Sequence, residues 1–205
     1  MTKPGVVIFD LGKVLLDFDY RQAAGRIAER SKLTPEQVMN TVAASPLLLR
    51  YETGLLDSRS FFDAICEATG FCGTYDEFAP AFGNIFEPIQ PMVNFQLSLK
   101  QAGIPTYIFS NTNDLAVAYI RQHFPFFNGF TGYFLSYELG VMKPEAAIYE
   151  IVEQITGRKG QDLLYIDDRP ENTEAGAARQ WQVITHTSPA DTIKQAAALG
   201  LPIEP

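Results

Sequence analysis

The stretch Val6-Val7-Ile8-Phe9-Asp10 decides the fold. Four apolar residues in a row, three of them β-branched, predict a strand that is buried on both faces. The strand ends on Asp10, and in open α/β sheets ligands bind at the carboxyl ends of the strands. Asp10 is therefore a candidate reactive group. An aspartate in this place can also be a simple turn residue, so its role depends on what later strands bring to the same edge.

Helix and strand patterns alternate from Pro88 onward. Buried strands are predicted at residues 104–109, 133–135, 163–166 and 182–185. The helices predicted around them cover residues 91–102, 114–123, 144–156 and 170–180, and Ser188 caps a terminal helix. Strands separated by helices of about a dozen residues imply right-handed crossovers and a parallel sheet.

The segment between the first strand and the later ones is helical in character. Its helix starts are marked by two capping boxes, Thr34 with Gln37 and Thr74 with Glu77, and by the N-cap residue Asp57. No convincing strand pattern appears there. We therefore expect an α/β fold with a Rossmann-like parallel core, residues 1–16 and 87–205. An all-helical cap domain, residues 17–86, is inserted after the first strand.

Composition narrows the classes of function. The 205 residues carry a net charge of −8, which argues against binding to nucleic acid because such surfaces are basic. No signal-peptide pattern and no membrane-spanning apolar run is evident, so we expect a cytoplasmic protein without membrane contact. Cys66 and Cys72 have no metal-binding or redox spacing. The sequence indicates no protein partner.

Polar residues follow the predicted strands at their carboxyl ends. They are Asp10, Ser110-Asn111 and Asp167-Asp168, and Lys143 precedes a helix on the same side. Carboxylates that converge on one crevice repel each other, and a divalent cation relieves that repulsion. Oxygen ligands favour Mg²⁺ over Zn²⁺. Asp10 as nucleophile, Lys143 as fixed cation and Ser110 with nearby backbone N–H groups as phosphate donors predict phosphoryl transfer through an aspartyl-phosphate.

These motifs together resemble the haloacid dehalogenase superfamily of phosphatases. The matching stretches are Phe9-Asp10-Leu11-Gly12, Ser110-Asn111, Lys143-Pro144 and Ile166-Asp167-Asp168-Arg169. The resemblance covers essentially the whole chain, and the helical insertion fits the subfamily with a helical cap. Within it, the chain looks most similar to the branch with alpha-glucose-1-phosphate phosphatase and the phosphatase domain of soluble epoxide hydrolase.

The resemblance implies a role for each motif residue. Asp10 would be the nucleophile and a Mg²⁺ ligand, with the main-chain carbonyl of Gly12 and the carboxylate of Asp168 as further ligands. Asp167 would act on the metal mostly through water. Ser110 and Asn111 would hold the phosphate, and Lys143 would bridge the nucleophile and the phosphoryl oxygens.

Position 12 departs from the family pattern. Most phosphatases of this family have an aspartate there, two residues after the nucleophile, as the general acid and base, and this chain has Gly12. Lys13, Asp17 and Asp19 are nearby replacement candidates. In the cap, residues 51–57 occupy the place of the family's substrate-selecting loop, where Arg50 and Arg59 are candidate anion contacts.

The leading hypothesis is a Mg²⁺-dependent phosphatase that hydrolyses a small phosphorylated metabolite, with sugar phosphates among the candidates. One alternative is a metal-independent dehalogenase, whose halide leaving group needs no proton. A second alternative is a catalytically weak protein that binds a phosphorylated metabolite, because Gly12 lacks the acid. The sequence does not identify the substrate or the oligomeric state.

Overall fold

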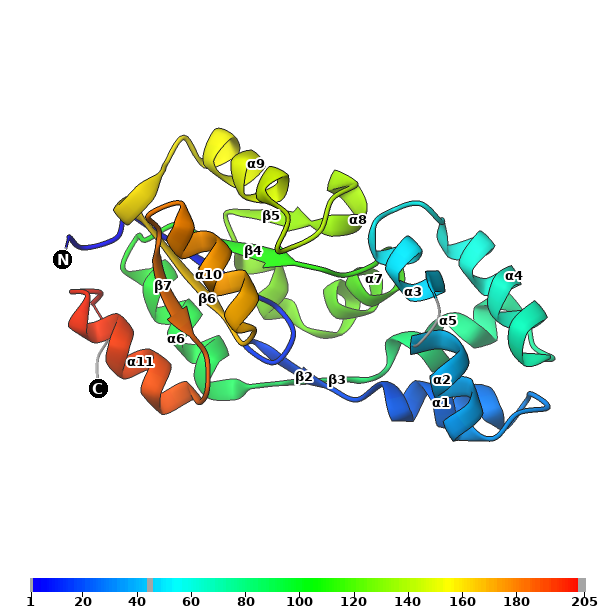
Figure 1. Ribbon diagram of the computed structural model, residues 1–205. Helices are drawn as coiled ribbons and strands as arrows, with labels where there is room; N and C mark the ends of the chain where they lie inside the picture. The colour runs from blue at the N-terminus through cyan, green and yellow to red at the C-terminus, as the bar shows by residue number, and fades with distance from the viewer. Residues whose placement is uncertain (1, 44–45, 203–205) are drawn as a thin grey trace.

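A five-stranded parallel sheet forms the centre of the computed structural model, which describes residues 2–43 and 46–202 (Figure 1). The strands lie in the order β5-β4-β1-β6-β7, so the first strand of the chain is the middle one. Their bounds are β1 Val6–Phe9, β4 Thr106–Ser110, β5 Gly132–Leu135, β6 Leu163–Asp167 and β7 Gln182–Thr185. All neighbours pair in parallel. The predicted α/β fold is confirmed, although β4 begins two residues later than expected.

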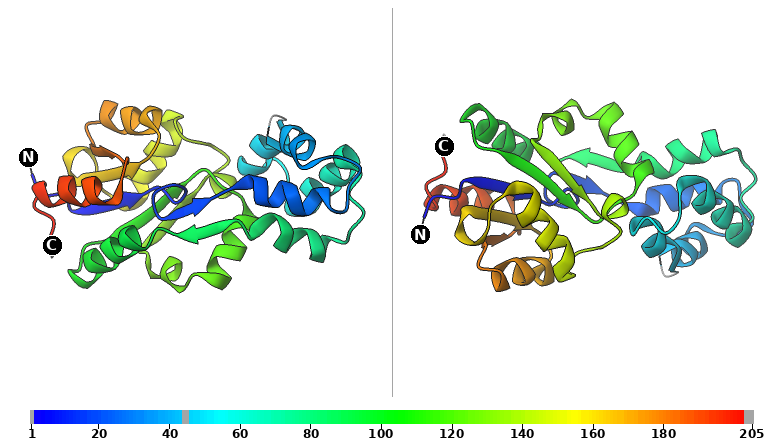
Figure 2. Two further views of the ribbon diagram at one scale, coloured as in Figure 1. Left: turned by 90° about the horizontal axis from the view of Figure 1, so that it is seen from below. Right: turned by 90° about the horizontal axis from the view of Figure 1, so that it is seen from above.

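Alternate residues of β1 pack into separate apolar clusters on the two faces of the sheet. Val7 and Phe9 pack with residues of α6, α7 and α11, whereas Val6 and Ile8 pack with residues of α9 and with Trp181. The helices on the first face are α6 Gln90–Gln101, α7 Asp114–His123 and α11 Pro189–Ala198. Those on the second face are α9 Ala146–Thr156 and α10 Pro170–Ala178 (Figure 2). Burial on both faces explains why β1 contains no polar residue.

The strand register brings the polar residues to one edge. Phe9 lies beside Ile108 of β4 and Ile166 of β6. The next residue, Asp10, therefore lies level with Asp167 at the end of β6 and with Phe109, one residue before the end of β4. Its N–H donates to the carbonyl of Ile166 at 2.8 Å. The convergence of these residues follows from parallel pairing alone.

The helices that the structure describes within residues 20–43 and 46–83 lie beyond this edge of the sheet (Figure 1). They are α1 Tyr20–Ala28, α2 Pro35–Ala43, α3 Pro46–Glu52, α4 Ser58–Thr69 and α5 Tyr75–Gly83. The predicted capping boxes at Thr34 and Thr74 and the N-cap at Asp57 are present. These helices bury an apolar cluster that includes Phe61, Phe78 and Phe82 and extends to Leu115 of α7.

The expectation of no strand in residues 17–86 needs correction at both margins. Strand β2, Leu16–Phe18, pairs antiparallel with β3, Phe86–Pro88, and this ribbon joins the sheet to the helices (Figure 2). Each strand has three residues, too few to show a periodic pattern. The expected domain bounds remain a prediction, and residues 1, 44–45 and 203–205 within them lie outside the described part.

The other differences between the predicted and the observed helices are small. Helix α9 begins at Ala146 rather than at Pro144, because Glu145 is its extended N-cap residue. A short helix, α8 Ser136–Leu139, follows β5 directly and was not predicted. In residues 2–43 and 46–202, no helix combines the length and the apolar character that crossing a bilayer requires.

Candidate active site

The side chain of Lys143 lies between two aspartates at the carboxyl edge of the sheet. Its Nζ is 3.0 Å from Oδ1 of Asp10 and 2.6 Å from Oδ2 of Asp167, and it also donates to the carbonyl of Phe109 at 2.8 Å. The lysine side chain is 1% exposed, so it is no solvated loop residue. Burial alone would lower the pKa of Lys143, but the two carboxylates raise it, which keeps the amine charged.

Asp167 is fully buried, and both of its carboxylate oxygens are held by donors. Tyr165 Oη and Lys143 donate to Oδ2, the N–H of Arg169 donates to Oδ1 at 2.8 Å, and Asn172 Nδ2 lies 3.1 Å from each oxygen. Burial opposes its ionised form, but Lys143 and these donors hold the pKa of Asp167 below its usual value. Asp167 is therefore a fixed anion that positions the lysine.

Asp10 and Asp168 are less completely paired. Asp10 Oδ1 accepts from the N–H of Leu11 at 2.7 Å and from Lys143. Burial raises the pKa of Asp10 to about 7 against the opposing effect of Lys143, and burial with the Asp167 charge also raises the pKa of Asp168. Burial is therefore the main reason that the ionised forms of both carboxylates are disfavoured, and the charge of Asp167 adds to this effect.

A divalent cation fits this cluster. One carboxylate oxygen from each of Asp10, Asp167 and Asp168 lies within 4.8 Å of the others. Three carboxylates face one ammonium group, so the cluster has an excess of negative charge. Asn172 Oδ1 is buried and has no hydrogen-bond partner among the described residues, which suits an acceptor for a metal-bound water. An oxygen-only donor set of this kind favours Mg²⁺.

The side chain of Asn111 holds the lysine loop against the end of β4. Its Nδ2 donates to the carbonyl of Lys143, and its Oδ1 accepts from the Lys143 N–H, both at 2.9 Å. The amide is therefore engaged with the protein on both sides. At this strand end the Ser110 hydroxyl, whose bond to the carbonyl of Asn111 is long at 3.4 Å, is the freer donor for an anion.

A pocket of about 280 Å³ opens above these residues. Its floor includes Asp10, Gly12, Ser110, Asn111, Lys143 and Asp168. The helices and the ribbon contribute Phe18, Tyr20, Leu48, Glu52 and Phe86 to its walls. The site therefore combines a charged floor with a largely apolar and aromatic wall, which is typical of a pocket for a small charged molecule.

Comparison with known proteins identifies the family. A family model for haloacid dehalogenase-like hydrolases matches residues 4–178.

The chain belongs to the haloacid dehalogenase-like hydrolase family.

Solved structures with the same fold include several members of this family. A haloacid dehalogenase family enzyme from Bacteroides thetaiotaomicron, solved with magnesium and inorganic phosphate, has a TM-score of 0.76, with 23% identity over 88% of this chain and 93% of that one. A hydrolase described as haloacid dehalogenase-like, from Porphyromonas gingivalis, has a TM-score of 0.79, with 20% identity over 96% and 98% of the two chains. L-2-haloacid dehalogenase from Xanthobacter autotrophicus has a TM-score of 0.64, with 15% identity over 99% and 85%.

The resemblance inferred from the sequence motifs is thereby confirmed, and the protein is a hydrolase of this family. The motif residues Asp10, Lys143, Asp167 and Asp168 lie together at the predicted edge, and Ser110 and Gly12 line the same pocket. Their individual roles remain predictions.

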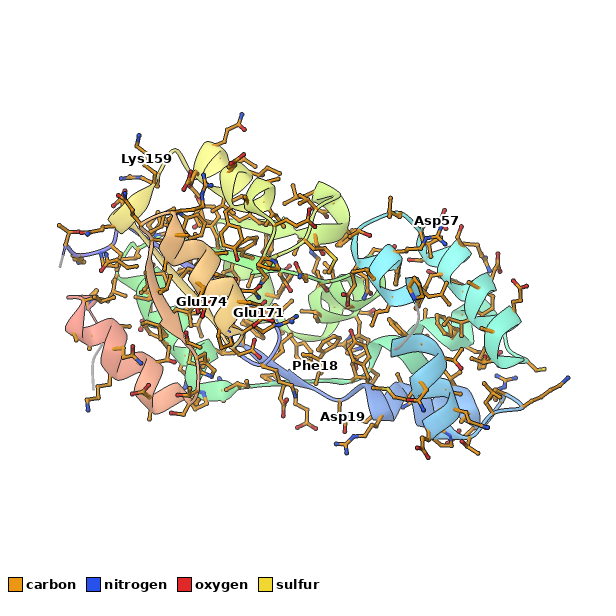
Figure 3. The ribbon with its side chains drawn as sticks, in the orientation of Figure 1. Phe18, Asp19, Asp57, Lys159, Glu171 and Glu174 are labelled. Atoms are coloured by element: carbon orange, nitrogen blue, oxygen red, sulfur yellow. The ribbon has the colours of Figure 1, made fainter. Side chains whose placement is uncertain are left out.

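Gly12 of this family member is packed against an aromatic ring. A Cβ atom placed on Gly12 would lie 2.7 Å from Cε1 of Phe18. Phe18 ends β2, where the ribbon meets the helices α1–α5 (Figure 3). The ring therefore fills the space that a side chain at position 12 would need.

Glu52, Tyr20 and Leu48 were not singled out by sequence reasoning. The predicted loop at residues 51–57 does reach the pocket, but through Glu52 rather than through an arginine. The guanidinium of Arg59 instead lies over the ring of Tyr75, at 4.6 Å from its centroid. No pattern in the sequence distinguished Glu52, because its position depends on how the end of α3 packs against Ser136 of α8.

Proposed function

We propose that this haloacid dehalogenase-like hydrolase is a Mg²⁺-dependent phosphatase that acts on a small phosphorylated metabolite. The observation that carries the proposal is the contact of Lys143 with Asp10 beside the oxygen cluster of Asp10, Asp167 and Asp168. An anionic nucleophile next to a fixed cation and a divalent-cation site matches the needs of phosphoryl transfer. The related fold solved with magnesium and inorganic phosphate supports the same assignment.

Asp10 is the proposed nucleophile. Its Oδ1 is fixed by the Leu11 N–H and by Lys143, so the carboxylate is oriented before substrate binds. One carboxylate oxygen attacks phosphorus, the ester bond to the leaving alcohol breaks, and an aspartyl-phosphate forms on Asp10. Water then attacks the same phosphorus, and the bond to Asp10 breaks to release inorganic phosphate. The ammonium group of Lys143 offsets negative charge on the transferring phosphoryl group.

Asp10, Asp168 and the carbonyl of Gly12 would hold Mg²⁺ directly. Bound Mg²⁺ would neutralise the clustered carboxylates and the charge of the phosphate. Asp167, whose oxygens are already taken by protein donors, would act through water and through Lys143. Ser110 and backbone N–H groups near Asn111 would bind the remaining phosphate oxygens.

The pocket supports a small substrate. Its volume of about 280 Å³ admits a phosphate with an organic group of sugar size. Phe18, Tyr20 and Phe86 offer aromatic faces for that organic group. Residues 17–86 would act as a cap that selects the substrate, because they supply Phe18, Tyr20, Leu48, Glu52 and Phe86 to the pocket wall.

The test is a panel of sugar phosphates, nucleotides, phosphoamino acids and an aryl phosphate, assayed for phosphate release with Mg²⁺. Activity is expected to disappear with EDTA and in Asp10→Asn, and mass spectrometry of the quenched enzyme should detect the aspartyl-phosphate. Asp63→Asn, which removes an exposed carboxylate of α4, is the matched control and should retain activity. Metal-independent halide release from 2-haloacids, without phosphatase activity, would overturn the proposal in favour of a dehalogenase. Binding of phosphorylated metabolites without turnover would overturn it in favour of a binding protein.

A further inference from the structure

Cleavage of an alkyl phosphate leaves an alkoxide, which needs a proton. Position 12 cannot supply one, because Gly12 has no side chain and the Phe18 ring lies where a side chain would project. A general acid or base typically contributes about 10² to 10⁴ in rate. An efficient phosphatase with this sequence therefore needs a proton donor elsewhere in the pocket.

The replacement candidates near position 12 are already paired: Lys13 with Asp17, and Asp19 with Arg21. Lys13 Nζ contacts Asp17 and donates to the carbonyl of Phe18 at 2.8 Å. Asp19 caps α1 and accepts from Arg21 Nε at 2.9 Å. The hydrogen bonds from Lys13 and Arg21 lower the pKa values of Asp17 and Asp19, so both are ionised at neutral pH. Neither aspartate lines the pocket.

Glu52 has the right chemistry and the right place. Of the carboxyl groups that the described residues bring to the pocket, it is the one that the proposed phosphoryl transfer leaves unused, since the others belong to Asp10 and Asp168. Tyr20 Oη donates to Glu52 Oε1 at 3.5 Å. Burial raises the pKa of Glu52 to about 7, against opposing effects of Tyr20 and Arg169, so the carboxyl group can both give and take a proton near neutral pH.

The backbone of Glu52 is fixed to the phosphate-binding edge of the sheet. Its carbonyl accepts from Ser136 Oγ at 2.6 Å, and the same Oγ accepts from the N–H of Thr112 at 2.9 Å. Thr112 lies two residues after Ser110 and also lines the pocket. Close by, a Cβ on Gly54 would lie 2.2 Å from the Tyr137 carbonyl oxygen, so the loop after Glu52 packs directly on α8. These contacts fix the backbone of Glu52 at the wall of the pocket, beside the edge of the sheet that carries Ser110.

We propose that Glu52, carried by the helical part of the chain, is the general acid and base of this enzyme and replaces the aspartate absent at position 12. The inference rests on the proposed phosphatase function. As the Asp10 carboxylate bonds to phosphorus, the ester P–O bond breaks, and the Glu52 carboxyl group gives its proton to the leaving oxygen, which departs as an alcohol. The Glu52 carboxylate then takes a proton from the attacking water while the bond between phosphorus and Asp10 breaks. Inorganic phosphate leaves, and both residues return to their starting states.

The test compares leaving groups in Glu52→Gln, which keeps the shape and the backbone contact to Ser136. With the best alkyl phosphate of the panel, kcat should fall by about 10² to 10⁴. With p-nitrophenyl phosphate, whose leaving group needs no proton, the first turnover should stay fast and release about one equivalent of nitrophenolate as a burst. Steady-state turnover should then be slow, because the second step lacks its base. Glu52→Asp, which restores a carboxyl group, should recover part of the alkyl phosphatase activity.

Glu67→Gln is the matched control, since Glu67 is an exposed carboxylate on α4. It should behave as wild type with both substrates. Unchanged alkyl phosphatase activity in Glu52→Gln would overturn the role of Glu52. An equal loss of activity with the alkyl and the aryl phosphate, without a burst, would also overturn the role of Glu52, because it would indicate a purely structural role.

The two proposals fail differently. A wild-type enzyme that hydrolyses the aryl phosphate but no alkyl phosphate is a phosphatase without a working acid, which overturns the inference about Glu52 alone. A wild-type enzyme that is inactive on the whole panel overturns the proposed function and the role of Glu52 with it.

Discussion

The ammonium group of Lys143 lies 2.6 Å from Oδ2 of Asp167, and both side chains are buried. Each neutralises a charge that the interior would otherwise disfavour, and Lys143 also faces Asp10 at 3.0 Å. The pair thus fixes the cation next to the proposed nucleophile. It also makes the stability of the fold depend on a residue of the site.

Replacing this lysine should destabilise the protein as well as inactivate it. Lys143→Met leaves Asp167 and Asp10 without their buried cation, which typically costs about 3 to 5 kcal/mol. Urea unfolding in EDTA measures this loss. Lys159→Met is the control, because Lys159 is exposed and lies at the end of the molecule away from the helices α1–α5 (Figure 3). Equal stability of Lys143→Met and wild type would show that the buried pair is not a source of stability.

Magnesium should stabilise the folded protein through Asp168. A ligand at about 100 times its dissociation constant adds about 2.7 kcal/mol to the free energy of unfolding. We expect Mg²⁺ to raise the melting temperature of the wild type and of Asp63→Asn, and to have a much smaller effect on Asp168→Asn. The measurement is calorimetry with and without EDTA, which needs no substrate. An undiminished shift in Asp168→Asn would exclude this carboxylate as a ligand.

The stability contribution of Glu52 should depend on pH with a definite sign. Its pKa is raised from 4.5 to about 7 in the folded state, chiefly by burial. The folded state therefore binds the proton more tightly, and ionised Glu52 destabilises the fold above pH 7 but not below about 4.5. Glu52→Gln should be more stable than wild type at pH 8, by up to about 3 kcal/mol. The difference should shrink as the pH falls toward 4.5.

Urea unfolding at several pH values measures the difference in stability between Glu52→Gln and wild type. Glu67→Gln should differ little from wild type throughout, because Glu67 is exposed. A Glu52→Gln variant that is less stable than wild type at pH 8 would contradict the predicted sign. It would mean that the Glu52 carboxylate gains more from its neighbours than it loses by burial.

The contact between position 12 and Phe18 should appear as an energetic coupling. Gly12→Ala adds a Cβ at 2.7 Å from the Phe18 ring, and such crowding typically costs about 1 to 3 kcal/mol. In a Phe18→Leu background the cost should be smaller. A double-mutant cycle measures the difference, which for residues in contact is about 0.5 to 3 kcal/mol.

Gly25 provides the control for that cycle. It lies inside α1, and a Cβ there would meet nothing within 4 Å. Gly25→Ala should therefore stabilise the protein by about 0.5 to 1 kcal/mol, in either background. Independence of the Gly12→Ala effect from the residue at position 18 would show that the ring moves away freely.

Most of the sheet could be predicted from the sequence because its strands are short apolar runs. Val6–Phe9 and Leu163–Ile166 are buried on both faces, so their composition alone marks them as strands. The ribbon β2–β3 could not be predicted, because its strands pair across the whole helical segment and neither is longer than three residues. A pairing between residues so far apart in the sequence cannot be inferred from local sequence patterns.

The candidate site was predictable for the same reason that the sheet was. Asp10, Ser110 and Asp167 are positioned by the strands that they end, so parallel pairing brings them together. Glu52 is positioned by packing, through the contact of its carbonyl with Ser136 on a different element. A residue that is positioned by tertiary contacts gives no periodic pattern in the sequence, and for this reason Glu52 was not predicted as a pocket residue.

The helical segment begins and ends at one point of the structure. The N–H of Asp19 donates to the carbonyl of Ile85 at 3.3 Å, just beyond the paired strands β2 and β3. Because its two ends meet, the whole segment occupies the position of a loop between the two strands of a β-hairpin. The order of the strands in the sheet therefore does not depend on the sequence of this segment. Gene rearrangement can therefore exchange this segment between relatives as one cassette. Because Glu52 lies within the segment, such an exchange would change the proposed acid and base together with the pocket wall.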